Sequence, residues 1–165
     1  MTNKYLATYL IDHLAGSVAA LELLEDLKAA YADTALAGFF AELQTDIASD
    51  QRQLQGLMDR LQIVESRPRK VSAWLTEKFI ELKLHLDDRA RGPLRLLESL
   101  EAVGLGIHGK LAMWHALNAA AEDFPPLQGL VDYERLAQRA EEQRRRVEVV
   151  RLEAAKAAFA AERTT

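Results

Sequence analysis

Residues 65–93, ESRPRKVSAWLTEKFIELKLHLDDRARGP, lie between two pairs of longer amphipathic patterns and decide how those patterns can be connected. Pro68 ends the pattern before it, because proline lacks a backbone donor and disfavours a helical conformation of the residue that precedes it. Residues 71–87 are amphipathic and predict a shorter helix. Pro93 then suits the first turn of the next long helix.

Apolar residues recur at steps of three and four along four long segments, which predicts four amphipathic helices. With the shorter helix included, the predicted ranges are about 4–32, 35–64, 71–87, 93–122 and 127–161. The first two long helices, and the last two, are joined by only a few residues and must be antiparallel neighbours. The sequence therefore predicts one all-α domain over residues 1–165, a four-helix bundle of two antiparallel hairpins joined by a long crossover with an extra helix.

The composition agrees with a helical domain and excludes several classes of site. The chain has 165 residues, 49% of them hydrophobic, and only 8 glycines and 4 prolines. Without cysteine it can have no disulfide framework and no thiolate metal site. A net charge of −4 gives no bulk positive field for nucleic acid. Because the sequence has neither a long apolar run nor a secretory signal, we expect a cytoplasmic protein without a membrane or nucleic-acid partner.

The hairpin, crossover, hairpin pattern and the polar residues that interrupt the inner apolar stripes resemble the ferritin-like superfamily over nearly the whole chain. In that superfamily, a Glu from each of two helices and a Glu-x-x-His pair from each of the other two hold two metal ions. None of the four histidines here follows an acidic residue at that spacing. The corresponding positions hold Leu10, Leu82, Leu105 and Ala112. The resemblance therefore implies a degenerate di-metal site, and we expect no metal, no cofactor and no catalytic residue.

Five polar residues are predicted at core-facing or core-flanking positions: Ser17, Asp50, His108, Gln143 and Arg144. They form either a remodelled ligand or metal pocket, or a hydrogen-bond network that fixes the register of the helices. A buried carboxylate is costly unless it is paired or protonated. We therefore expect Asp50 to pair with His108, Gln143 or Arg144.

Two further patterns have a structural interpretation. Gly104, Gly106 and Gly109 lie in a helical context rather than in a strand-to-helix turn, so they predict close helix approach and not a phosphate loop. The arginine run 144–146 is interleaved with glutamates. This alternation predicts a solvated, salt-bridged helix face rather than a phosphate or nucleic-acid site.

Two classes of function remain open from the sequence. The first is a non-catalytic ferritin-like structural or interaction protein, a homodimer that pairs through an apolar face or binds an unidentified protein partner. The second is a ferritin-like stress-response protein that binds a single metal ion or a small molecule at the altered interior site. Stoichiometric metal in the purified protein would favour the second class, and its absence would favour the first.

Overall fold

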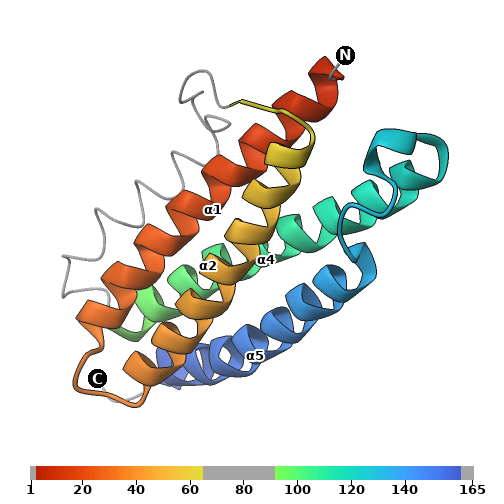
Figure 1. Cartoon of the computed structure of the whole chain (residues 1–165). Coiled ribbons are helices and arrows are strands. Elements are labelled where there is room, and N and C mark those ends of the chain that lie inside the picture. Colours follow the sequence, from red (N-terminus) through yellow and green to blue (C-terminus); the bar gives the residue numbers. More distant parts are fainter. Residues whose placement is uncertain (1–2, 65–91, 161–165) are drawn as a thin grey trace.

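The computed structural model describes residues 3–64 and 92–160 of the chain (Figure 1). These two stretches contain four long helices, one short 3-10 helix and no strand. The elements are α1 (Lys4–Ala30), α2 (Leu36–Arg60), α4 (Gly92–Asp123), η2 (Pro125–Leu127) and α5 (Tyr133–Ala160). The predicted all-α fold with four long helices is confirmed. The shorter helix predicted at 71–87 lies outside the described residues.

The four long helices pack as two hairpins (Figure 1). Helix α1 packs along α2, and α4 packs along α5, so each short connection joins two neighbouring helices. Helix α1 also contacts α4, which brings the two hairpins together. None of the described helices combines the length and the apolar content that a membrane span requires.

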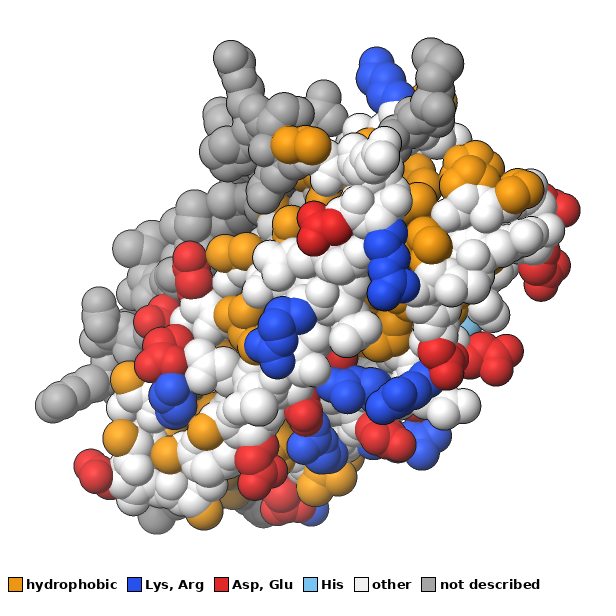
Figure 2. All heavy atoms as spheres, in the orientation of Figure 1, with side chains coloured by type: hydrophobic (Ala, Val, Ile, Leu, Met, Phe, Trp, Pro, Cys, Tyr) orange, Lys and Arg blue, Asp and Glu red, His pale blue; other side chains and the backbone are white. Residues whose placement is uncertain are grey.

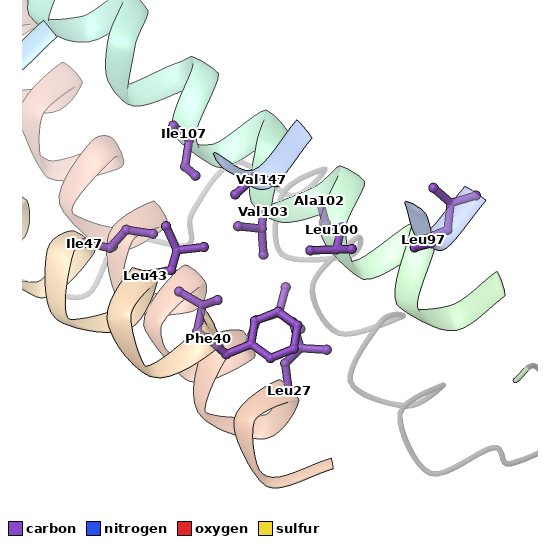
Figure 3. Packing of buried hydrophobic residues seen from close by; sticks show 13 residues of the cluster. Leu27, Phe40, Leu43, Ile47, Leu97, Leu100, Ala102, Val103, Ile107 and Val147 are labelled. Carbon is purple, nitrogen blue, oxygen red and sulfur yellow. The ribbon is translucent and has the colours of Figure 1, made fainter. Parts of the chain in front are cut away.

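Two apolar clusters form the core of the bundle, and each draws residues from all four long helices. The first includes Leu24, Phe40, Leu100 and Val147, and the second includes Leu10, Leu57, Trp114 and Leu136 (Figure 3 shows the first). Burying one large apolar side chain contributes about 1.5–3 kcal/mol to folding, so these clusters supply most of the driving force. On each helix the two clusters occupy different segments, which leaves an intermediate level between them.

The end of α2 corrects the predicted range of 35–64, because the helix ends at Arg60. Gln62 has a left-handed backbone conformation with a φ of 55°. The backbone N–H of Ile63 donates to the carbonyl oxygen of Met58 at 2.9 Å. Of the two hydrogen bonds of a Schellman motif, this is the one that spans more residues. The motif ends helices and usually has glycine at the left-handed position. Gln62 takes that position here, so no glycine in the sequence marks the end.

The start of α5 also differs from the prediction, which placed it at 127, whereas the helix begins at Tyr133. The residues before it form η2 and a turn. Asp132 caps α5, because its Oδ1 accepts a hydrogen bond from the backbone N–H of Arg135 at 3.0 Å. The Tyr133 hydroxyl donates to the carbonyl oxygen of Leu127 at 2.8 Å, which fixes the preceding turn to the helix.

Candidate functional site

A polar layer crosses the bundle at the level between the two apolar clusters. On α2, Asp50 takes a place in the buried stripe between Ile47 and Leu54. Gln143 takes a comparable place on α5. Both residues are only 2% exposed. The same three- and four-residue spacing that buries the leucines therefore carries these two polar side chains into the interior.

The carboxylate of Asp50 accepts hydrogen bonds from three side chains on the other hairpin. Lys110 of α4 donates through Nζ to Oδ2 at 2.6 Å, and Gln143 donates through Nε2 to the same oxygen at 2.8 Å. Arg139 of α5 donates through Nε to Oδ1 at 3.0 Å. Lys110 Nζ also donates to Oε1 of Gln143. Every member of the network is thus tied to at least one other member across the bundle.

The network contains more positive than negative charge. The side chain of Lys110 is 15% exposed and that of Arg139 is 33% exposed, and within residues 3–64 and 92–160 Asp50 is the only acid hydrogen-bonded to either of them. Burial lowers the pKa of Lys110 below its usual range, and the neighbouring carboxylate of Asp50 opposes that shift. With both bases protonated, the three groups carry one net positive charge.

Ser17 lies at a similar level on α1 but bonds elsewhere. Its hydroxyl donates to the carbonyl oxygen of Leu14 at 2.6 Å. It also accepts from Nε2 of Gln51 at 2.9 Å, which links α1 to α2. The serine therefore belongs to the contact within the first hairpin rather than to the network around Asp50.

The predicted interior set is brought together only in part. Asp50 and Gln143 are hydrogen-bonded to each other, as expected. His108 is exposed on α4. Arg144 is partly exposed and donates to Glu141 at 2.7 and 2.9 Å. Of the three alternative partners predicted for Asp50, Gln143 is therefore confirmed, and His108 and Arg144 do not contact it. Each of these two residues directly follows a buried residue and so points about 100° away from it around the helix.

Lys110 and Arg139 were not predicted as partners of Asp50, although their spacing from buried residues places them on the inner faces of their helices. Lys110 follows Ile107 by three residues and precedes Trp114 by four, so it falls within the buried stripe. Arg139 follows Leu136 by three residues. A long basic side chain can run its aliphatic stem along apolar surface while its charged end reaches a distant partner. A basic residue on a buried stripe is therefore the partner to seek for a buried carboxylate.

The side chains of this layer do not fit a di-metal centre. Across residues 3–64 and 92–160, no group of three or more His, Cys, Asp or Glu side chains is placed to hold a metal ion. Both carboxylate oxygens of Asp50 already bind cationic side chains, Lys110 at one and Arg139 at the other. A dication needs carboxylates and neutral donors, whereas protonated amines and guanidinium groups have no lone pair to offer it.

A cavity of about 300 Å³ lies beside the polar layer, between α1, α2 and α4. Its wall is mainly apolar, and its polar members include Asp50 and Lys110. The rings of Tyr9 and His13 also line it and lie 4.6 Å apart, centre to centre. Burial lowers the pKa of His13 and raises that of Tyr9, which favours the neutral form of both.

The glycines of α4 do not serve close helix approach, contrary to the prediction. A Cβ atom at Gly106 or Gly109 would meet no packed neighbour within 4 Å. At Gly104 it would lie 3.9 Å from Cγ1 of Val147, an ordinary van der Waals distance. Gly106 and Gly109 instead line the cavity, as Gly16 of α1 does.

The arginine run 144–146 forms the salt-bridged face that the sequence predicts. Arg144 and Arg145 both pair with Glu141, and Arg146 pairs with Asp46 of α2. Hydrogen bonds from Arg144 are the main reason why the pKa of Glu141 falls to about 2. Figure 2 shows the blue and red side chains interleaved on the surface, with no large area of one sign in this view. Each arginine of the run is therefore paired with an acidic side chain.

Comparison with known proteins does not indicate a family or a function for this chain. No protein-family model, curated protein or solved structure matches the chain. A helical bundle by itself is compatible with many functions, so a function has to be inferred from the side chains of the site.

Proposed function

We propose that this chain is a non-catalytic protein of ferritin-like topology, in which a buried ion-pair network stands in place of a di-metal centre. The observation that carries the proposal is the 2.6 Å contact between Nζ of Lys110 and Oδ2 of Asp50, at the level between the two apolar clusters. In ferritin-like bundles the metal ions lie among side chains that project inward from the four helices. In this chain the interior level carries one carboxylate, one amide and two cations.

The network joins the two hairpins. Asp50 belongs to the first hairpin, and its three partners belong to the second. A dication bound at Asp50 would have to displace Lys110 and Arg139, and the guanidinium stays protonated at any working pH. The layer thus acts as a cross-link in the interior, and it offers neither a redox centre nor an activated water.

The proposal includes a homodimer formed through α5. Val149, Leu152 and Phe159 are 66%, 45% and 67% exposed, and their spacing places them on one face of the helix. Exposed apolar side chains gathered on one face favour a protein contact. A second copy related by a twofold axis would present the same residues and cover both faces at once.

Metal analysis tests the non-catalytic part of the proposal. Protein purified from iron- and manganese-rich medium is expected to contain well under one equivalent of either metal and to show no ferroxidase activity. Asp50→Ala is expected to change neither result. Near two equivalents per chain in the wild type, abolished by Asp50→Ala, would overturn the proposal and identify a metal centre that includes this carboxylate.

Light scattering tests the dimer. At tens of micromolar we expect the mass of two chains, and Phe159→Glu is expected to give the mass of one chain because it places a charge in the apolar contact. The matched control is Tyr5→Glu, since Tyr5 is an aromatic residue that is 84% exposed on α1 and lies outside the proposed contact. A wild-type monomer at this concentration would end this part of the proposal.

A second candidate function is binding of a small molecule at the altered interior site, as in a ferritin-like stress-response protein. The cavity beside Asp50 and Lys110 is the observation that favours it. Because the cavity lies between helices of both hairpins, it resembles the places where helical bundles hold ligands.

A further inference from the structure

The cavity between α1, α2 and α4 has the size and the wall of a site for a small apolar molecule. Its volume of about 300 Å³ is at the lower end of the range found for ligand pockets. An apolar cavity of about half that volume holds one benzene molecule. A molecule of about ten non-hydrogen atoms therefore matches the available space.

Three glycines keep this space open. Gly16, Gly106 and Gly109 all line the cavity, and a Cβ atom at any of them would meet no packed neighbour within 4 Å. Glycine inside a helix is less favourable than alanine, and helix packing would accommodate alanine at each of these positions. The absence of side chains at these places thus enlarges the cavity without improving the contact between the helices.

Two hydrogen-bond donors, Lys110 and Trp114, belong to the cavity wall. Lys110 Nζ donates to Asp50 and Gln143, and its side chain is 15% exposed, so its third hydrogen is open to solvent or to a bound molecule. Trp114 is fully buried, and its Nε1–H has no partner among the described residues. Because a buried donor without an acceptor is costly, the polar part of this cavity favours a molecule that brings acceptor atoms.

We infer that the cavity binds a compact apolar monocarboxylate, with its carboxylate accepting a hydrogen bond from Nζ of Lys110. The anion would pair with the positive charge that Lys110 and Arg139 leave after pairing with Asp50, whereas Asp12, the other acid of the cavity wall, is exposed on α1. An aliphatic or aromatic body would lie against the apolar wall beside Trp114. The inference rests on the second candidate function and gives it a class of ligand.

Other ligand classes fit this wall less well. A metal cation at Asp50 would lie next to two positively charged side chains. A sugar or a nucleotide needs many hydrogen-bonding groups around it, and the wall here is mainly apolar. A neutral hydrocarbon derivative would leave the charge of Lys110 uncompensated, and this difference can be measured directly.

Titration calorimetry on the full-length chain, with octanoate and octan-1-ol as probes, tests the inference. Octanoate is expected to bind with one molecule per chain, at least about tenfold more tightly than octan-1-ol, because only the anion forms a charge-assisted hydrogen bond. Lys110→Met is expected to weaken octanoate binding by about tenfold or more and to leave the affinity for octan-1-ol unchanged. Equal affinity of the wild type for the two probes would overturn the inference, and so would octanoate binding that Lys110→Met does not affect.

A substitution that fills the cavity locates the bound molecule. Gly106→Leu extends a side chain into the space and is expected to abolish octanoate binding while the thermal unfolding transition remains cooperative. Gly38→Leu is the matched control, because Gly38 is an exposed helical glycine that does not line the cavity and a Cβ atom there also meets no neighbour. Gly16→Leu fills the same space from α1 if the first variant does not fold. Octanoate binding that survives in a folded cavity-filling variant would show that it binds elsewhere, contrary to the inference.

The result is separable from that of the metal analysis. A chain that contains no metal and does not bind octanoate would refute the carboxylate site and leave the non-catalytic bundle standing. A chain that holds two metal ions would refute the bundle proposal by itself.

Discussion

Removing the carboxylate of Asp50 should destabilise the fold by about 3 kcal/mol, because two of the partners it leaves behind, Lys110 and Gln143, are largely buried. In Asp50→Ala, Lys110 remains 15% exposed without its hydrogen-bonded carboxylate, and Gln143 loses its acceptor at 2.8 Å. Breaking a buried ion pair from one side costs about 3–5 kcal/mol. Arg139 is 33% exposed and can turn to solvent, so we take the lower end of that range.

The complementary substitution should cost less. In Lys110→Met, Asp50 keeps the guanidinium of Arg139 and the amide of Gln143, so the carboxylate stays partnered. We expect a loss of about 1–2 kcal/mol. The double variant Asp50→Ala/Lys110→Met removes the carboxylate and the ammonium together and leaves no unpaired buried ammonium. The coupling energy between the two positions is therefore expected to be about 2 kcal/mol, within the range for residues in one network.

Urea unfolding followed by helical circular dichroism, at pH 7 and at one fixed protein concentration, measures the four free energies of this cycle. The control is Glu153→Ala, which removes an acid from an exposed ion pair with Lys156 and should change the stability very little. A coupling energy below about 0.5 kcal/mol would refute the reasoning, since it would mean that the ammonium and the carboxylate do not depend on each other.

The remaining predictions concern single side chains. Burial lowers the pKa of His13 below its usual value of 6.5, so the unfolded chain takes up a proton before the folded chain does, and the free energy of unfolding should fall as the pH drops below 6.5. His13→Asn should reduce that fall between pH 7.5 and 5.5, and an equal fall in this variant would contradict the assignment to His13. Gly106→Ala should raise the free energy of unfolding by about 0.5–1 kcal/mol, since the added Cβ meets no neighbour, and a lower value would contradict the open geometry. Tyr133→Phe should lower it by about 1 kcal/mol through loss of the hydrogen bond to Leu127, and an unchanged urea midpoint would show that this bond contributes nothing.

The sequence was sufficient to predict the four long helices and the buried carboxylate. Asp50 and Gln143 interrupt stripes whose other buried members are all hydrophobic, so their positions follow from helical periodicity alone. The partners of Asp50 could not be predicted in the same way. Periodicity gives the direction of a side chain around its own helix, but it does not give the distance that a flexible side chain reaches. His108 was predicted at a core-flanking position on α4, beside the stripe that buries Ile107, and the structure places it in solvent. An error of one residue, about 100°, moves a side chain from the interior to solvent.

Neither the helix ends nor the cavity could be predicted from the sequence, and the reasons differ. Gln62 adopts a left-handed conformation that sequence rules reserve for glycine or asparagine, and tertiary contacts decide such a case. The residues next to it on either side, Leu61 and Ile63, pack with the second apolar cluster and hold the turn in place. A glycine on a helix is equally compatible with close approach of a neighbouring helix and with an open cavity beside it. Only the position of the neighbouring helices distinguishes these two cases, as at Gly106.

A polar layer between two apolar clusters opposes a shift of the helices more strongly than apolar packing does. If α2 moved by one turn, about 5.4 Å, an apolar residue such as Leu54 would come to the level of Lys110. The leucines of both clusters would still pack against apolar side chains, so apolar packing alone opposes such a shift only weakly. The ammonium of Lys110 would lose its carboxylate while still largely buried, which is among the most costly changes available to a protein interior. One carboxylate with two cationic partners can thus fix the register of the two hairpins at the level between the two apolar clusters.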